Sequence, residues 1–413
     1  MEAFHHYLND LINRNKKLYS TYPEIKWLSA YGAIEAEEKR KQLLDWNKNS
    51  WLFKNTKPFH NKISDGCGLC GQGLWSCLFI TGKCNANCFY CPTSQQNDDK
   101  PTSQQLTFET PEAYAEYVSY FGFKGVSFSG GEPLLYFDRT LSYLKAVRKY
   151  CSPDIYIWMY TNGILANKVK LKRLEESGLN EIRFDIGATG YKLDRVRLAK
   201  GIVPNITIEI PSIPEEKERI IALLPMMIDA GVTNLNLHQL RLTPYNADKL
   251  TKHQYTYIAA EHPIVLESEL AALEIMKFAN QNQLNIGINY CSFHFKYRFQ
   301  KAGYRKRIVS KIVDKNLSVT EKGYVRSVEN NKIEYQGIFL NDVSLNNNQP
   351  GLKLKNKSYI IKQGTAYRSN QLSVSDKKTI TKLTEAEPKE IPNNLLEFNV
   401  WNHEYIESDL RQY

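Results

Sequence analysis

The feature that most constrains the fold is a regular alternation of short β-rich runs with longer amphipathic segments between residues 78 and 290. Seven runs are rich in β-branched and aromatic residues, and helical patterns lie between them. Strand–helix repetition predicts a parallel sheet with helices outside it. Seven such strands form either an open sheet or an incomplete barrel, with chemistry at the carboxyl ends of the strands. The expected strands are Leu78–Thr81, Gly125–Ser129, Ile155–Tyr160, Glu181–Ile186, Ile206–Ile210, Asn234–Leu237 and Ile286–Asn289.

The intervening segments carry helix-start features. One helix is expected to begin after Thr110, because Pro111 suits the first helical position. The other expected helices cover Asp138–Tyr150, Asn167–Ser177, Glu215–Ala230 and Glu267–Asn280. The predicted fold class is therefore α/β, an incomplete (β/α)6-type parallel barrel over residues 61–300 with a cysteine-rich entry segment.

Two further regions flank this barrel. Residues 1–60 have helix-like spacing and are expected to form an N-terminal helical arm. Residues 301–413 are expected to contain a basic connector and a small β-rich C-terminal domain. Within it, Tyr324–Val328 and Ile333–Tyr335 flank an Asn-Asn pair, which predicts a β-hairpin.

The composition is that of a globular protein, with 42% hydrophobic and 24% charged residues. No signal-peptide pattern is found near the first residue. No apolar run approaches the roughly 20 residues that a membrane-spanning helix needs. We therefore expect a cytoplasmic protein with no membrane partner.

The formal net charge is +10, and part of the excess is concentrated in one stretch without Asp or Glu. This stretch is either a solvated basic helix face or a patch for phosphate or nucleic acid. Aromatic residues interleave with its cations, as in proteins that stack bases, although aromatic residues at this spacing more often pack in a core. The cations are Lys296, Arg298, Lys301, Arg305, Lys306, Arg307 and Lys311, and the aromatic residues are Phe295, Tyr297, Phe299 and Tyr304.

The chain has eight cysteines, and three of them form the motif Cys84-Asn-Ala-Asn-Cys88-Phe-Tyr-Cys91 directly after the first strand. A loop of this kind can wrap three thiolates around one iron–sulfur cluster. Three sulfurs on a four-iron cluster leave one iron open to a substrate or cofactor. A structural zinc site would need a fourth protein ligand.

Polar residues also mark the ends of the later strands. Gly130-Gly131-Glu132-Pro133 ends the second strand, where the glycines let the backbone approach a ligand closely. The third strand ends in Thr161-Asn162-Gly163. The next three end at Asp185, Glu209 and His238, which are candidates for cofactor contacts or ordinary loop residues.

The three-cysteine motif, the Gly-Gly-Glu-Pro turn and the Thr-Asn-Gly turn resemble those of the radical S-adenosylmethionine superfamily. The resemblance implies a [4Fe-4S] cluster on Cys84, Cys88 and Cys91 that binds S-adenosylmethionine. It implies that one electron, from a donor such as flavodoxin or ferredoxin, yields a 5′-deoxyadenosyl radical that abstracts hydrogen from a substrate.

The same resemblance implies roles for the strand-end residues. Tyr90 is expected beside the adenine, and the turn from Gly130 to Pro133 at the methionine amino group. Thr161, Asn162, Asp185, Glu209 and His238 are candidates for the ribose hydroxyls or the methionine carboxylate.

The remaining cysteines suggest a second metal site. Cys67-Gly-Leu-Cys70 is a tight ligand pair, and Cys291 follows the last strand, so these three can hold an auxiliary cluster, iron–sulfur in preference to zinc. Cys77 is a doubtful fourth ligand, because it is expected to start the first strand and so to lie away from the carboxyl ends of the strands. It also suits a buried apolar position. Cys151 is expected to be structural.

Longer segments are similar to a superfamily subgroup described as related to pyruvate formate-lyase activating enzymes, over about residues 65–300. This relationship names no substrate. Three functions remain: an enzyme acting on RNA, an enzyme acting on a peptide or protein, including a glycyl-radical activase, and a non-catalytic iron–sulfur sensor or electron carrier. The reaction subclass, whether oxidoreductase, transferase or lyase, stays open. The segments are Cys67–Cys70, Phe79–Cys84, Asp185–Thr189, Ile208–Pro214 and Tyr290–Ser292.

Overall fold

The computed structural model describes residues 2–47, 50–104, 106–260 and 262–312, and beyond them seven short strands between residues 318 and 366. None of the described helices combines the length and the apolar character needed to cross a bilayer.

A sheet of eleven strands in the order β2-β3-β14-β11-β10-β9-β8-β7-β4-β5-β6 forms the body of the molecule. Its seven central strands, from β14 to β4, are mutually parallel. The expected seven strands are confirmed with small shifts at their ends. They are β4 (Trp75–Thr81), β7 (Gly125–Gly130), β8 (Tyr156–Thr161), β9 (Glu181–Phe184), β10 (Asn205–Pro211), β11 (Asn234–His238) and β14 (Gly287–Cys291).

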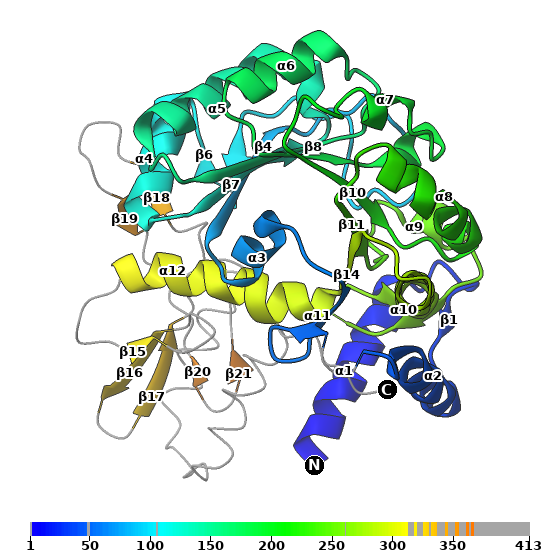
Figure 1. Cartoon of the computed structure of the whole chain (residues 1–413). Helices are drawn as coiled ribbons and strands as arrows, with labels where there is room; N and C mark the ends of the chain where they lie inside the picture. The colour runs from blue at the N-terminus through cyan, green and yellow to red at the C-terminus, as the bar shows by residue number, and fades with distance from the viewer. Residues whose placement is uncertain are drawn as a thin grey trace.

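The sheet curves into a barrel that stays open between its first and last parallel strands (Figure 1). At one edge β14 pairs antiparallel with β3 (Lys57–His60), which pairs with β2 (Trp51–Leu52). At the other edge β4 pairs antiparallel with β5 (Thr102–Ser103), and β6 (Leu106–Thr107) follows. The predicted incomplete parallel barrel is thus confirmed.

Helices cover the outside of the barrel, as the alternating pattern predicts (Figure 1). The first of them begins after Thr110, whose hydroxyl accepts from the Ala113 N–H at 3.2 Å, and Pro111 occupies its first turn. The helices are α4 (Pro111–Phe121), α5 (Phe137–Tyr150), α6 (Lys168–Glu176), α7 (Asp194–Arg197), α8 (Lys217–Asp229), α9 (Ala247–Leu250) and α10 (Leu266–Gln281).

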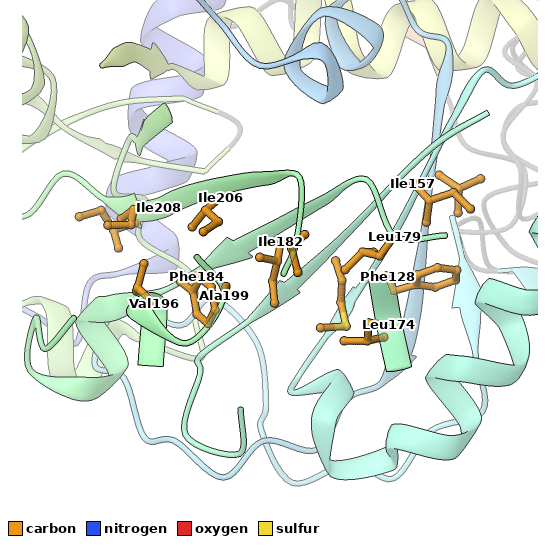
Figure 2. Close-up of a cluster of buried hydrophobic side chains, with 14 of the residues drawn as sticks. Phe128, Ile157, Leu174, Leu179, Ile182, Phe184, Val196, Ala199, Ile206 and Ile208 are labelled. Carbon is orange, nitrogen blue, oxygen red and sulfur yellow. The ribbon is translucent and has the colours of Figure 1, made fainter. Parts of the chain in front are cut away.

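The hydrophobic core lies between the strands and these helices. On β9 and β10 every second side chain is apolar, and Ile182, Phe184 and Ile208 pack beside Leu174 of α6 and Val196 of α7 (Figure 2). Each fully buried side chain of this size contributes about 1.5–3 kcal/mol to stability. The alternate positions on the same strands are polar and face the barrel interior.

A short helix, α3 (Asp65–Gly71), lies inside the ring of strands (Figure 1). The Ser64 side chain caps it by accepting from the Cys67 N–H at 3.3 Å. At Gly66 an added Cβ would overlap the Arg183 guanidinium and crowd Trp158, so only glycine permits this contact. The cysteine-rich entry segment is therefore an interior element of the barrel.

The N-terminal region departs from the expected all-helical arm. It contains the helices α1 (Glu2–Leu18) and α2 (Ala30–Leu44), but also β1 (Lys26–Trp27), β2 and β3. The strand β3 belongs to the main sheet, because it pairs antiparallel with β14, and three of its four residues are buried. The helical interpretation of residues 1–60 is therefore wrong for residues 51–60.

The C-terminal region is described in part. After β14 come α11 (Phe293–Phe295), a π-helical segment η4 (Lys296–Lys301) and α12 (Ala302–Ile312). The expected hairpin is present as β16 (Val325–Glu329) paired antiparallel with β17 (Lys332–Gln336). Most of the expected β-rich domain lies outside the described residues, so its extent stays a prediction.

Candidate active site

The three-cysteine loop follows β4 and is held from the opposite side of the barrel. The Asn246 side chain donates to the Tyr90 carbonyl at 3.3 Å, and the Thr243 hydroxyl donates to the Pro92 carbonyl at 3.1 Å. The Lys249 ammonium donates to Asn87 Oδ1 at 2.7 Å. These contacts come from the segment after β11, so the loop bridges the first and the sixth parallel strands.

The thiols of this loop are partly buried. Burial raises the pKa of Cys88 to about 12 and raises the pKa of Cys84 above its usual value. Metal binding would release these protons, since thiolates are the ligands of iron. Within the described residues no three His, Cys, Asp or Glu side chains are grouped to hold a single metal ion. A four-iron cluster offers separate corners to its ligands, so its thiols need not converge on one point.

The glycine turn after β7 lies directly against this loop. An added Cβ at Gly131 would overlap the Lys83 carbonyl, and one at Gly130 would overlap the Thr81 carbonyl. Gly130 also has φ +116°, a conformation that side chains disfavour. The turn therefore requires glycine to bring its backbone beside the residue that precedes Cys84.

Glu132 is fully buried at this turn and organises it. Its carboxylate accepts from the Leu134 N–H at 2.9 Å, the Thr161 hydroxyl at 2.8 Å and the Asn162 N–H at 2.7 Å. Burial raises the pKa of Glu132 to about 7, against the lowering effect of these donors. The predicted cofactor residue Glu132 thus joins the ends of β7 and β8, while Pro133 begins the short helical turn that follows.

Asn162 links this turn to the cysteine loop. Its side-chain amide donates to Asn85 Oδ1 at 2.7 Å and lies 3.6 Å from the Cys84 sulfur. Because Asn162 is 7% exposed, this amide is fixed in place. The structure therefore brings together three predicted site segments: the cysteine loop, the glycine turn and the Thr161-Asn162 strand end.

Tyr90 and Asp185 form a second link. The Tyr90 hydroxyl donates to the Asp185 carboxylate, which also accepts from the Gly187 N–H at 3.0 Å. Burial raises the pKa of Asp185 to about 6, although both donors act to lower it. This pair connects the cysteine loop to the end of β9.

Glu209 and His238 are also neighbours, but their partners lie inside the barrel. The Glu209 carboxylate lies 2.7 Å from His238 Nε2 and 2.7 Å from Arg183 Nη1, and accepts from Asn236 at 3.0 Å. Burial alone would raise the pKa of Glu209, but Arg183 and His238 lower it well below its usual value. Their predicted contact with a cofactor stays a prediction.

The cysteines outside the loop fall into two groups. Asn236 of β11 donates to the Cys67 sulfur, and Cys291 of β14 pairs with His238 of β11, so both cysteines lie near the carboxyl end of β11. Burial, together with Cys291 and Cys67, raises the pKa of Cys70, and all three cysteines favour the charged form of the buried Lys57. Burial would raise the pKa of Cys291, but the ammonium groups of Lys57 and Lys296 lower it to about 6.

Cys77 and Cys151 lie elsewhere. Cys77 lies within β4, two residues after its start and not at its start as expected, and burial raises its pKa to about 12 beside the hydroxyl of Ser127. The Cys151 thiol donates to the Ala115 carbonyl at 3.4 Å beneath α4, consistent with a structural role.

The basic stretch after β14 is largely a packing element. Phe295, Tyr297 and Tyr304 are buried, and Phe53 packs on both Phe295 and Phe299. Arg307 donates to the carbonyls of Gly73, Phe121 and Gly122. The rings of Phe295, Tyr297 and Tyr304 are therefore not available to stack on bases.

Several residues of the site were not predicted from sequence. Lys57, Arg183, Asn236 and Asn246 carry much of its polar network. A pattern in the sequence pointed to some of them, since polar residues at every second position of a strand share one face. Glu181, Arg183 and Asp185 follow this pattern on β9.

A family model described as the Radical SAM superfamily matches residues 78–209. This range contains the cysteine loop, the glycine turn and the ends of β8 and β9. A protein of Methanocaldococcus jannaschii, provisionally named a glycyl-radical enzyme activating enzyme, is 29% identical over 280 residues, which are 64% of this chain and 72% of that protein. The GTP 3′,8-cyclase of Campylobacter jejuni is 28% identical over 129 residues, 31% of this chain and 39% of that enzyme.

Solved structures match at lower similarity. Streptococcus suis SuiB bound to the precursor peptide SuiA is 14% identical, with a TM-score of 0.41, over 60% of this chain and 53% of that one. The chain anSMEcpe with bound AdoMet and a Cp18Cys peptide is 16% identical, with a TM-score of 0.30, over 39% of this chain and 50% of that one. This chain thus spans about half the length of these solved proteins.

Proposed function

Because this chain belongs to the radical S-adenosylmethionine superfamily, whose enzymes use a [4Fe-4S] cluster and S-adenosylmethionine, we propose that Cys84, Cys88 and Cys91 hold that cluster. The turn from Gly130 to Pro133 and the end of β8 at Asn162 would hold S-adenosylmethionine beside it. When bound, the two groups supply a 5′-deoxyadenosyl radical that abstracts hydrogen from a substrate.

The observation that carries this proposal is the chain of hydrogen bonds that runs from Glu132 through Asn162 to the cysteine loop. Asn162 reaches the loop at Asn85 and Cys84, while the Glu132 carboxylate holds the Asn162 backbone. The donor set fits an iron–sulfur cluster, because three thiols lie in one loop and leave one iron open. The glycine turn fits this arrangement, because the absence of side chains at Gly130 and Gly131 lets it pack against the Thr81 and Lys83 carbonyls, directly before the cysteine loop.

The chain's own residues would position the cofactor. Gly130 and Gly131 expose backbone groups beside the loop, and Glu132 fixes that turn through three donors. Tyr90 and Asp185 link the cysteine loop to the end of β9, where they would contact the adenosine portion of S-adenosylmethionine. The burial of this network excludes water from charged groups, which strengthens their interactions.

For the substrate we propose a peptide or protein chain. The provisional name of the Methanocaldococcus jannaschii relative points to a protein substrate. An RNA substrate has less support, because Phe295, Tyr297 and Tyr304, three of the four aromatic residues of the basic stretch, are buried. The name of the Campylobacter jejuni enzyme makes a nucleotide the second candidate.

Formation of 5′-deoxyadenosine tests the enzymatic proposal. We expect the reconstituted protein to produce it with S-adenosylmethionine and dithionite under anaerobic conditions. The Cys88→Ala variant should lose this activity, whereas Cys151→Ala, which alters a cysteine beneath α4, should keep it. Absence of product from the cluster-loaded wild-type protein would favour a non-catalytic sensor or electron carrier.

Substrate deuterium incorporation tests the proposed substrate class. A library of peptides with deuterated α-carbons is incubated with the active enzyme, and deuterium in 5′-deoxyadenosine is measured by mass spectrometry. Deuterium transfer from a peptide supports the proposal. Transfer only from deuterated nucleotides or RNA would contradict it. Reduced flavodoxin or ferredoxin should replace dithionite as the electron donor.

A further inference from the structure

The barrel interior contains a second group of thiols that the proposed function does not use. Cys67 and Cys70 lie one turn apart on α3, and Cys291 ends β14. Cys67 and Cys291 are 7% and 9% exposed. We propose that Cys67, Cys70 and Cys291 hold a second [4Fe-4S] cluster inside the barrel, with the Lys57 ammonium as its buried counter-charge.

The backbone brings these cysteines together from distant parts of the sequence. The strand β14 pairs with β11 so that Cys291 lies beside His238. Two residues earlier on β11, the Asn236 side chain donates to the Cys67 sulfur at 3.2 Å. The helix α3, which carries Cys67 and Cys70, lies inside the ring to which β11 and β14 belong (Figure 1).

The buried positive charge of Lys57 beside these thiols favours the binding of an anion. Lys57 is 1% exposed, and its ammonium lies 4.4 Å from the centre of the Phe295 ring. In the described part of the chain it forms no ion pair with a carboxylate, and the groups that most favour its charge are Cys291, Cys67 and Cys70, ahead of the Glu209 carboxylate. A buried ammonium is costly unless it is compensated. A cluster bound by three thiolates carries net negative charge and would compensate it.

A cluster suits this site better than a single ion. The described residues contain no group of three acidic, histidine or cysteine side chains placed to hold one ion. Zinc would need four ligands converging on one point. A four-iron cluster is larger and takes its thiolates at separate corners. Cys77 lies within β4, where its thiol is hydrogen-bonded to the hydroxyl of Ser127, so we assign three cysteine ligands to the site.

Iron content tests the proposal without any turnover. After anaerobic reconstitution, two four-iron clusters should give about eight irons per wild-type chain. The triple variant Cys84→Ala/Cys88→Ala/Cys91→Ala and the triple variant Cys67→Ala/Cys70→Ala/Cys291→Ala should each retain about four. The single variants Cys77→Ala and Cys151→Ala should retain the wild-type content. Circular dichroism establishes that each variant is folded.

The outcomes separate the two clusters. If the variant without the three loop cysteines binds no iron, or if the second triple variant binds as much as the wild type, the second cluster is overturned. Zinc in place of iron at the remaining site would overturn it as well. If the variant without the three loop cysteines kept the wild-type iron content, the loop would not hold a cluster, and the proposed function would fail instead.

The role of Lys57 is tested through the midpoint redox potential of the second cluster. This potential is measured in a redox titration that is monitored by electron paramagnetic resonance. The protein without the three loop cysteines isolates this cluster. Replacing Lys57 by Met removes a buried positive charge and should lower the midpoint potential, because the added electron loses a favourable interaction. Lys57→Arg should preserve the potential, as should Lys62→Met at an exposed position. An unchanged potential in Lys57→Met would overturn the role of Lys57.

Discussion

The Tyr90 hydroxyl donates to both carboxylate oxygens of Asp185, at 3.0 and 3.1 Å. Tyr90 lies between two cysteines of the loop, whereas Asp185 ends the fourth parallel strand. The pair therefore fixes the loop to the barrel, in addition to the contacts that Asn246 and Thr243 make with the loop backbone.

Replacing Tyr90 by Phe removes this link. Asp185 would lose a donor at a buried position, and its pKa would rise further above about 6. The loss of a hydrogen bond to a charged group should lower the free energy of unfolding by about 1.5–3 kcal/mol. Chemical denaturation measures this change. Tyr245→Phe, at an exposed tyrosine, should leave stability unchanged; equal effects of the two variants would contradict the prediction.

Adding one methyl group at Gly131 should abolish binding of S-adenosylmethionine. The new Cβ would overlap the Lys83 carbonyl, so the turn must move away from the cysteine loop. Equilibrium dialysis of the iron-loaded protein measures the binding. Gly68→Ala is the matched control, because nothing lies within 4 Å of its added Cβ. That helical substitution should preserve binding, and it should not be destabilising.

Glu132 should make stability depend on pH. Its folded pKa of about 7 lies above the usual value of 4.5, so the folded protein binds the extra proton between these values. The free energy of unfolding should therefore fall as pH rises through this window, by up to about 3 kcal/mol from this group. Glu132→Gln should remove this component from denaturation curves recorded between pH 4.5 and 8.

The matched control for that measurement is Glu112→Gln, at a carboxylate in the first turn of α4. It should keep the wild-type pH dependence. A Glu132→Gln variant with the full wild-type dependence would show that the effect arises from other groups.

Replacing Arg183 should lower the free energy of unfolding strongly, because this cation pairs with carboxylates inside the barrel. Its guanidinium lies 2.9 Å from Glu181 and 2.7 Å from Glu209, and all three side chains are buried. Arg183→Met would leave buried Glu181 without its cation and buried Glu209 with His238 alone, which costs about 3–5 kcal/mol. Arg173→Met breaks an exposed pair with Asp138 and should cost at most about 1 kcal/mol. Urea denaturation compares the two variants; similar losses would contradict the prediction.

The strands and helices of the barrel were predictable because their patterns are local. Alternating apolar residues mark β9 and β10, and Thr110-Pro111 marks the start of α4. The expected strand ends differ from the observed ones by a few residues at most, as at β4, which begins at Trp75. The three-cysteine motif was likewise evident, because all its ligands lie within one short loop.

The strand β3 escaped prediction because its neighbours in the fold are far away in the sequence. Residues 57–60 are a short run that contains a proline, which disfavours a central strand. Their pairing with β14 at the sheet edge supplies the burial that the run itself does not indicate. The burial of the aromatic residues after β14 was also not predictable from their local sequence, since their spacing fits both base stacking and core packing.

The sequence by itself determined the parallel barrel and the cysteine loop, because both follow from the spacing of residues that are neighbours along the chain. Only the tertiary structure decided which side chains share the barrel interior. Lys57 and Cys291 meet there because β3 and β14 pair and α3 lies inside the ring. The free energy of such a buried charge depends on all its neighbours, and no local pattern contains that information.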